Sequence, residues 1–133
     1  MSVGHDTVWL RVDVPASQTN QALNFLTSGV SVSEYICPFA LCVSRVRLIL
    51  TEKRTAGTLT VTIWKNGVAV AVPVPILLDT SYPQLRDVVV DQSQSTQFDL
   101  GGRLAVVFTT DAAWLPVTSD LVAIVSLARP YGP

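Results

Sequence analysis

The most constraining feature of this sequence is a stretch of strictly alternating apolar and polar residues that ends at Asn66 and Gly67. In Thr58–Lys65 the residues expected to face inward are Leu59, Val61 and Ile63, and threonines and Trp64 occupy the alternate positions. A period of two is that of a β-strand with one buried face. Asn-Gly tolerates the positive φ angles of a type I′ turn. The stretch therefore predicts a hairpin whose return strand covers 68–74.

The composition favours the same kind of structure elsewhere in the chain. Val, Ile and Thr make up about 29% of the 133 residues, whereas only two Glu and two Lys are present. β-branched residues fit a pleated sheet, while helix surfaces are normally rich in Glu and Lys. The chain is 49% hydrophobic and 14% charged, which argues against a helical bundle, a coiled coil or a disordered tail.

Alternation predicts further strands at 7–14, 30–35, 43–51, 85–91, 103–110 and 120–128. The face of the first strand that is expected to be buried carries Val8, Leu10, Val12 and Val14. Trp9 lies on its other face. The last strand is nearly continuous in apolar residues, so we expect it to be central. Tight turns alternate with long crossings, which indicates a single antiparallel β-sandwich of eight or nine strands with jelly-roll or Greek-key connections.

Three segments depart from the strand pattern. Residues 17–26 predict at most one short helix, with a loop containing a single helical turn as the alternative. Cys37-Pro38 interrupts an apolar run, which indicates a sheet edge or a switch between sheets. We expect one domain over residues 1–133, with an N-terminal arm at 1–6 and an extended tail at 129–133.

Charge and hydropathy patterns exclude several partners. The net charge is −1, so the chain lacks the basic footprint of a nucleic-acid-binding protein. No apolar run approaches the roughly 20 residues of a membrane-spanning helix. The first residues lack the basic and apolar regions of a signal peptide, so we expect synthesis in the host cytoplasm and no secretion.

The sequence offers little for catalysis or metal binding. His5 is the only histidine, and one His with two Cys cannot form an ordinary closed zinc site. Cys37 and Cys42 have apolar neighbours and are expected to be buried, reduced thiols. The candidate carboxylate pairs are Asp87 with Asp91 and Asp99, and Asp111 with Asp120. All of them border turns, where Asp commonly bonds to nearby backbone. We therefore expect no enzymatic activity, no cofactor and no metal.

The apolar excess instead predicts a surface that neighbouring subunits cover. The candidate contact residues are Trp9, Arg45, Arg47, Trp64, Trp114, Arg129 and Tyr131. Arg45 and Arg47 share one face of the 43–51 strand, where a protein contact is favoured over nucleic acid. Trp64 or Trp114 could alternatively stack against a sugar, as in a lectin-like module.

Residues 35–127 resemble a jelly-roll-like β-sandwich domain common among virion proteins of tailed phages. The motifs that carry the resemblance are Ala56-Gly57 before the alternating strand, Lys65-Asn66-Gly67, Phe98-Asp-Leu-Gly101 and Ser119-Asp120-Leu121. The chain departs from the pattern where Gly-Asp is usual, because it has Gly101-Gly102-Arg103.

The resemblance implies a protein that acts by adhesion. Such domains occur in capsid decoration (cement) proteins, which often form trimers on the capsid lattice, and in tail-fibre or receptor-binding tips. The chain contains no shaft repeats or coiled-coil stalk, which favours decoration. The implied partners are further copies of the chain, as a homotrimer, and the major capsid protein or other virion subunits. The implied location is the outer surface of the capsid.

Overall fold

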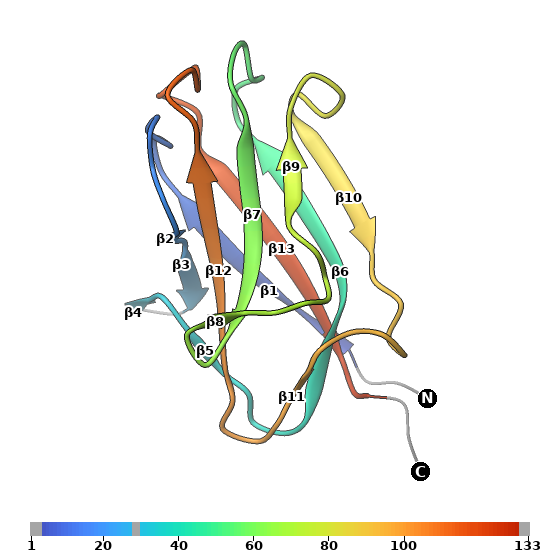
Figure 1. The fold of residues 1–133 in the computed structure, drawn as a ribbon. Helices are drawn as coiled ribbons and strands as arrows, with labels where there is room; N and C mark the ends of the chain where they lie inside the picture. The colour runs from blue at the N-terminus through green and yellow to red at the C-terminus, as the bar shows by residue number, and fades with distance from the viewer. Residues whose placement is uncertain (1–3, 28–29, 131–133) are drawn as a thin grey trace.

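Two antiparallel sheets pack face to face in the computed structural model of the chain, which describes residues 4–27 and 30–130 (Figure 1). Sheet A consists, in spatial order, of β10 (Leu85–Val89), β6 (Leu41–Leu50), β13 (Leu121–Ala128), β1 (Gly4–Arg11), β3 (Asn24–Thr27) and β4 (Val30–Val32), and β11 (Gln97–Phe98) also pairs with β6. Sheet B consists of β2 (Gln21–Ala22), β12 (Arg103–Thr110), β7 (Leu59–Lys65) and β8 (Val68–Ala69), with β5 (Tyr35–Ile36) paired to β12 and β9 (Ile76–Leu78) paired to β7.

This arrangement confirms the predicted all-β sandwich with two antiparallel sheets. None of the described residues forms a helix. The predicted central position of the last strand is correct, because β13 pairs along its length with both β6 and β1. The predicted switch at Cys37-Pro38 is also correct. The chain leaves sheet B after β5, passes through 37–40 and enters sheet A at β6.

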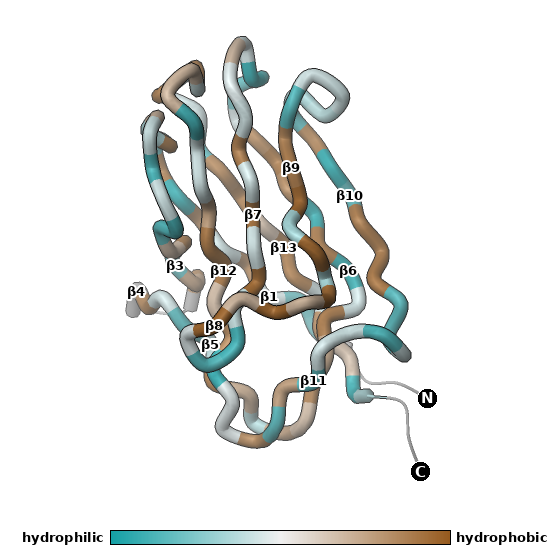
Figure 2. Tube along the Cα trace, in the orientation of Figure 1, coloured by the Kyte–Doolittle hydropathy of each residue, from teal (hydrophilic) through white to brown (hydrophobic). Residues whose placement is uncertain are grey.

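Side chains from both sheets fill the space between them and form one core. Hydrophobic residues are concentrated along strands such as β9 and β13 (Figure 2). The largest fully buried side chains are Trp9, Trp114, Phe98, Phe108, Leu41, Leu48 and Leu104. Thr7 and Ser119 are among the few buried polar residues, and both form hydrogen bonds. The core therefore needs no polar network to hold the sheets together.

The predicted hairpin forms at Asn66-Gly67. Lys65 and Val68 are paired, and the two turn residues have φ angles of 52° and 83°. These values fit the mirror-image turn that the Asn-Gly pair favours. The predicted return strand is wrong beyond β8, because the chain leaves the ladder and passes through a bend that contains Pro73. The residues of 68–74 alternate poorly, and Pro cannot donate to a ladder.

Residues 17–26 contain no helix, so that prediction is wrong. Their backbone groups bond to other parts of the chain: Ser17 N donates to Asp111 O, and Leu23 N donates to Val106 O over 2.8 Å. Ser17 and Asn20 also have positive φ angles, which a helix does not allow. Long-range hydrogen bonds to β12 and its loop outweigh the weak local helical preference.

The strand count and the chain ends also differ from expectation. Thirteen strands occur among the described residues, and six of these are only two or three residues long. Segments this short are too brief to show alternation. β1 begins at Gly4, so residues 4–6 belong to sheet A and do not form an arm. Residues 1–3 of the predicted arm and 131–133 of the predicted tail, including Tyr131, lie outside the described residues.

β1 shows the predicted alternation with its two faces exchanged. Trp9 is fully buried and packs on Phe25, with 5.1 Å between ring centroids. Val8 and Leu10 are half-buried on the outer face, and Val12 is 55% exposed. Trp9 is the large apolar side chain of its face, whose buried Thr7 hydroxyl is hydrogen-bonded, and an indole removes more apolar surface from water than a valine does. Its burial therefore decides the orientation.

Candidate interaction surface

The outward side of sheet A carries aliphatic side chains across four neighbouring strands. The ladder registers place Leu85, Ile49, Val122 and Leu10 side by side in one row, from β10 through β6 and β13 to β1. Val8 and Ile124 are paired in the next row. Because side chains alternate between faces, these residues all lie on the surface that faces away from sheet B. We call this surface the aliphatic face and include in it the neighbouring residues Val12, Leu26 and Val89.

Several side chains of the aliphatic face are largely exposed. Leu26 is 49% exposed, Leu85 is 59% exposed and Val89 is 75% exposed. The other five strand residues of the face, Val8, Leu10, Ile49, Val122 and Ile124, are half-buried by one another. A shallow depression lined by Leu10, Arg11, Val12, Asn24 and Leu26 lies at the β1–β3 side. Val89 is separated from the other members of the face by Asp87 and Arg45, and the remaining side chains are contiguous. Contiguous exposed apolar surface of this kind is typical of interaction sites.

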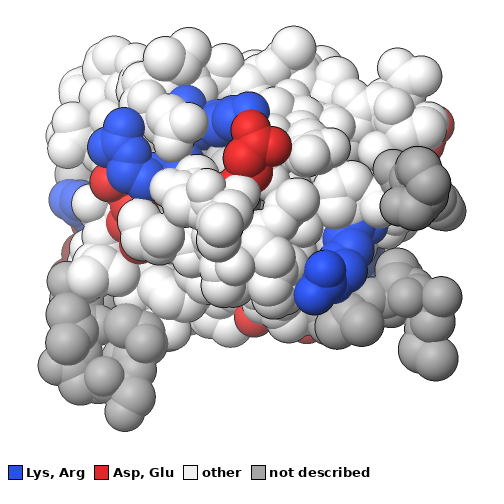
Figure 3. Space-filling model, turned by 90° about the horizontal axis from the view of Figure 1, so that it is seen from below, with Lys and Arg blue, Asp and Glu red and all other residues white. Residues whose placement is uncertain are grey.

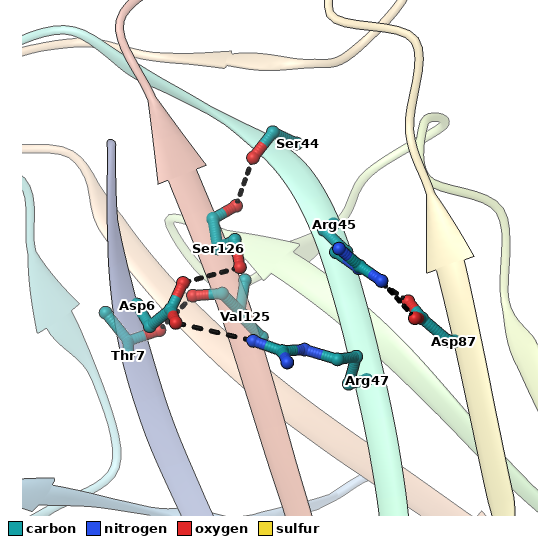
Figure 4. Close-up of polar contacts among 8 residues, drawn as sticks. All are labelled: Asp6, Thr7, Ser44, Arg45, Arg47, Asp87, Val125 and Ser126. Carbon is teal, nitrogen blue, oxygen red and sulfur yellow. Dashed lines mark hydrogen bonds and ion pairs between the residues drawn. The ribbon is translucent and has the colours of Figure 1, made fainter. Parts of the chain in front are cut away.

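Ion pairs flank one end of the aliphatic face (Figure 4). Arg45 donates Nε–H to an Asp87 carboxylate oxygen over 2.7 Å, and its terminal nitrogen bonds to the other oxygen. Asp6 and Arg47 lie 3.4 Å apart, and Ser126 donates its hydroxyl to Asp6 over 2.6 Å. The hydrogen bond from Arg45 holds the pKa of Asp87 below its usual range, and the same contact raises the pKa of Arg45. Two Arg and two Asp make this end electrically balanced.

The outward side of sheet B has a different character. Its strand positions carry Thr60, Thr62, Thr109, Ala105, Val107 and Trp64. Trp64 is half-buried between Ala105 on β12 and Ala69 on β8. The side chains are short and several can bond to water through a hydroxyl. Sheet A therefore offers the more apolar of the two outer faces.

An apolar pocket opens at the side of the sandwich where the edges of the two sheets meet. It encloses about 230 Å³, with β9 and the segment before it on one wall and β10 on the other. Its lining includes Val72, Val74, Pro75, Ile76, Val88 and Val90. Arg86 and Asp91 also contribute to the lining. The pocket has no cluster of polar groups suited to chemistry.

The three tryptophans occupy positions that the sequence pattern did not resolve. Trp9 and Trp114 are both fully buried, which is incompatible with their predicted exposure. Trp114 donates its indole N–H to Val14 O over 3.2 Å and closes one end of the core. A loop position gave no indication of this burial. Trp64 alone lies on an outer face, as alternation predicts.

The arginine candidates are placed as the alternation indicates. Arg45 and Arg47 lie on the outer side of β6, in the ion pairs described above. Arg129 is exposed, and its guanidinium lies 4.1 Å from the centre of the Phe39 ring. At the end of the molecule seen in Figure 3, basic side chains form small separate groups, some beside acidic ones, and most of the visible surface is uncharged.

The titratable residues are dispersed or locally bonded. His5 lies within β1, with Nε2 2.8 Å from the Tyr35 hydroxyl. Cys37 and Cys42 are buried free thiols, as predicted, and burial raises the pKa of Cys37 to about 11. Among the described residues, no three His, Cys, Asp or Glu side chains form a metal-binding group.

The candidate carboxylates form separate local contacts. Asp91 accepts hydrogen bonds from the backbone and hydroxyl of Ser93, and this contact lowers its pKa. Asp111 accepts from Thr58 N, and Asp120 accepts from Asp13 N over 2.9 Å. The Asp91 contact is the turn contact expected of Asp, whereas those of Asp111 and Asp120 join the backbone of segments distant in sequence. No helix in the described part of the chain has the length and apolar character needed to cross a bilayer.

The aliphatic face itself was missed by the sequence reasoning, although a signal for it exists. Val122 and Ile124 alternate with core residues in an almost wholly apolar strand, a pattern that indicates both a central position and an apolar outer face. In β1, Val8 and Leu10 were assigned to the core. A strand with two apolar faces in a two-layer sandwich has one face left over, and that face points outward.

Comparisons with known proteins support the fold. No protein-family model and no curated protein matches the sequence. A chain in the acidic stable capsid structure of Helicobacter pylori bacteriophage KHP30 is similar in structure, with a TM-score of 0.51 and 12% identity, covering 98% of this chain and 94% of that chain. The globular domain of zebrafish complement 1qA protein has a TM-score of 0.44 and 15% identity, covering 96% of this chain and 98% of that chain. At 12% identity the similarity to the phage capsid chain shows a shared fold.

Proposed function

We propose that this chain is a structural virion protein that decorates a phage capsid, binding the outer capsid surface as a homo-oligomer and stabilising the shell. The observation that carries the proposal is the aliphatic face of sheet A. Aliphatic side chains form no hydrogen bonds with water, so burying them against a neighbour costs little. Each Å² of apolar surface buried stabilises the contact by about 25 cal/mol. A protein with this surface is suited to permanent contact with neighbours.

Two further observations support the proposal. A chain with this fold over almost its full length occurs in a phage capsid structure. The described carboxylates and thiols are bonded locally or buried, which fits a protein that acts by binding. Decoration also suits a small chain, because modest contacts become strong when many copies bind one lattice.

The proposal can be tested with capsids assembled from the major capsid protein of the same genome. The double variant Val12→Asp/Leu26→Asp places two carboxylates on the aliphatic face at positions that are 55% and 49% exposed. We expect it to fold normally and to lose at least about tenfold in affinity for the capsid, because each buried charge must be desolvated. Co-sedimentation with capsids measures the affinity.

The matched control is Val68→Asp, which places a carboxylate at a 68% exposed valine on the β7–β8 hairpin, away from the aliphatic face. It should bind like the unmodified protein. If both variants bind capsids equally well, or if the unmodified protein does not bind, the proposed function is wrong.

A carbohydrate-binding module, as in a tail-fibre or receptor-binding tip, is the second candidate. The observation that favours it is Trp64, whose half-buried indole lies on the threonine-rich outer face of sheet B. Aromatic rings on polar surfaces can stack against sugars. A glycan array with the purified protein and Trp64→Ala tests this alternative, and it fails if no glycan binds in a Trp64-dependent manner.

A further inference from the structure

β10 is the outermost strand of sheet A, and its free side is unpaired among the described residues. The flanking bonds to β6 define which residues face that side. Leu50 N donates to Gln84 O, and Val90 N donates to Ser44 O, both over 2.9 Å. Since bonding direction alternates along an antiparallel strand, the even-numbered residues bond to β6. The N–H and C=O groups of residues 85, 87 and 89 therefore point away from the sheet.

This edge carries the charged side chains of Arg86 and Asp87 but lacks the other usual protection against pairing. In natural proteins, features such as Pro, Lys, bulges or a covering segment keep edge strands from pairing with another chain. β10 reads Leu-Arg-Asp-Val-Val and is paired to β6 without a register shift. The neighbouring edge of sheet B is protected, because Arg86 donates to Leu77 O over 2.9 Å and stacks 4.1 Å from the Tyr82 ring.

Apolar side chains lie on both sides of the strand beside the free edge, next to the Arg45–Asp87 ion pair. Val89 is 75% exposed and Leu85 is 59% exposed, and both belong to the aliphatic face. On the opposite side of the strand, Val88 lines the pocket whose rim includes Val74, which is 66% exposed. A strand that pairs with β10 would cover apolar groups on both sides of the ladder.

We propose that β10 pairs antiparallel with β10 of a second copy, about a twofold axis at Val88. The inference rests on the homo-oligomeric part of the proposed function and names the contact through which two copies meet. A twofold contact pairs a surface with itself, so the strand must be compatible with its own charge pattern.

Charge determines the register. Only the odd-numbered residues have outward backbone groups, so the bonded pairs must join odd-numbered residues of the two copies. Three registers, with axes at 86, 87 and 88, pair at least two of residues 85, 87 and 89 in each copy. An axis at Arg86 sets two guanidinium groups opposite each other, and an axis at Asp87 does the same with two carboxylates. Like charges directly opposite destabilise a ladder.

An axis at Val88 avoids both conflicts. It pairs Val88 with the second copy's Val88 and places each Asp87 opposite the second copy's Val89. Each Asp87 also remains bonded to its own Arg45. Because the pairs Asp6–Arg47 and Arg45–Asp87 balance in charge, the two copies approach without net repulsion at this edge.

The contact also bears on capsid binding. The twofold axis of an antiparallel strand pair is perpendicular to the sheet, so both copies present their aliphatic faces on the same side. The dimer then offers one continuous surface twice as wide as that of a single copy. Joining two docking faces raises their combined affinity for a lattice without any new type of contact.

Disulfide trapping tests the register. Residues paired without hydrogen bonds in an antiparallel ladder have Cα atoms about 4.5 Å apart, within the range of a disulfide. We expect Val88→Cys to form covalent dimers on mild oxidation, at least about tenfold more than Arg86→Cys or Asp87→Cys, whose equivalent atoms lie farther apart in this register. The native cysteines are buried and contribute little background.

Val68→Cys is the control for disulfides that form when two proteins collide at random. Val68 is 68% exposed on the β7–β8 hairpin, whereas Val88 is half-buried. Collision alone would crosslink Val68→Cys more readily than Val88→Cys. That ranking, or preferential crosslinking of the Arg86 or Asp87 variant, would overturn the proposed contact.

Two proline variants test the ladder itself. Val89→Pro removes an N–H that faces the free edge, so the bonds to β6 are kept and only pairing with a second copy is lost. Val90→Pro removes the N–H that bonds to Ser44 O and should destabilise the fold. We expect light scattering to show a dimer for the unmodified protein and a folded monomer for Val89→Pro. A monomeric or threefold mass for the unmodified protein, or an unchanged mass for Val89→Pro, would overturn the inference.

These measurements use the purified protein alone, so they separate this inference from the proposed function. If the protein forms the predicted dimer but neither it nor its monomeric variant binds capsids, the decoration role fails and the contact stands. If the unmodified protein is monomeric yet binds capsids, the contact and the homo-oligomeric part of the proposed function are wrong, and the decoration role stands.

Discussion

Gly57 lies directly against the backbone of Trp114: a Cβ atom at Gly57 would come within 2.4 Å of the Trp114 nitrogen and 2.5 Å of its Cα. The same residue has a φ of +76°, which favours glycine. The close approach lets Ala56 and Leu115 form a bridge, and Leu115 N donates to Ala56 O over 3.0 Å. The loop that carries Trp114 is thereby held over the end of the core.

We therefore predict that Gly57→Ala destabilises the protein by several kcal/mol, because the methyl group forces the loop away from the core. Gly67→Ala is the matched control, since Gly67 has a similar φ of +83° but no atom within 4 Å of the added methyl. Gly67→Ala should lower the free energy of unfolding by about 1 kcal/mol, through conformational strain alone. Urea denaturation of both variants measures the difference, and equal losses would show that the steric contact is unimportant.

Thr7 links two buried polar groups within sheet A. Trp9 donates its indole N–H to Thr7 Oγ1 over 2.8 Å, and Thr7 donates its hydroxyl to Val125 O over 2.9 Å. We predict that Thr7→Val lowers the free energy of unfolding by about 2–3 kcal/mol, because it leaves a buried donor without a partner. Thr7→Ser retains the hydroxyl and should cost less. Chemical denaturation compares the two, and a loss of stability for Thr7→Ser as large as that for Thr7→Val would contradict the importance of these hydrogen bonds.

The Cys37 thiol provides a prediction for alkaline pH. Its pKa is raised from 9.0 to about 11, chiefly because burial disfavours the thiolate. The folded state keeps the thiol proton more tightly than the unfolded state does. Its contribution to stability is therefore fully present below pH 9 and is lost as the pH rises through 11.

Denaturation curves at pH 7, 9 and 11 test this expectation. The unmodified protein should lose more stability between pH 9 and 11 than Cys37→Ala does, although the variant starts less stable because of the missing packing. Parallel pH profiles for the two proteins would contradict the assignment. Comparing the two profiles removes the contributions of other groups that titrate in this range.

Local sequence features predicted those parts of the fold that depend on short-range geometry. Asn66-Gly67 specifies its turn through the φ angles that the two residues allow, and alternation located the long strands β6, β7, β12 and β13 to within a few residues. The failures have a common cause. Residues 17–26 are held by hydrogen bonds to segments about 90 residues away, which no local pattern reveals.

For the candidate surface, alternation separated the two faces of each strand but did not say which face is core. In β6 the arginines marked the outer face correctly, because a charged group rarely lies unpaired in a core. In β1 the buried face carries Trp9 together with Thr7, whereas the outer face carries Val8 and Leu10, and the space left between the sheets decides which face is core. Trp9 and Phe25 fill that space together, which leaves Val8 and Leu10 outside.

The sequence by itself determined an all-β chain with a tight Asn-Gly hairpin and more apolar residues than one core needs, because period and composition are local properties. The tertiary structure decided where the surplus lies: on the aliphatic face of sheet A and beside the free edge of β10. Contacts between residues distant in the chain set the order of the strands and determine which face of each strand points into the core. Only the packed sandwich therefore shows which apolar side chains remain without a partner.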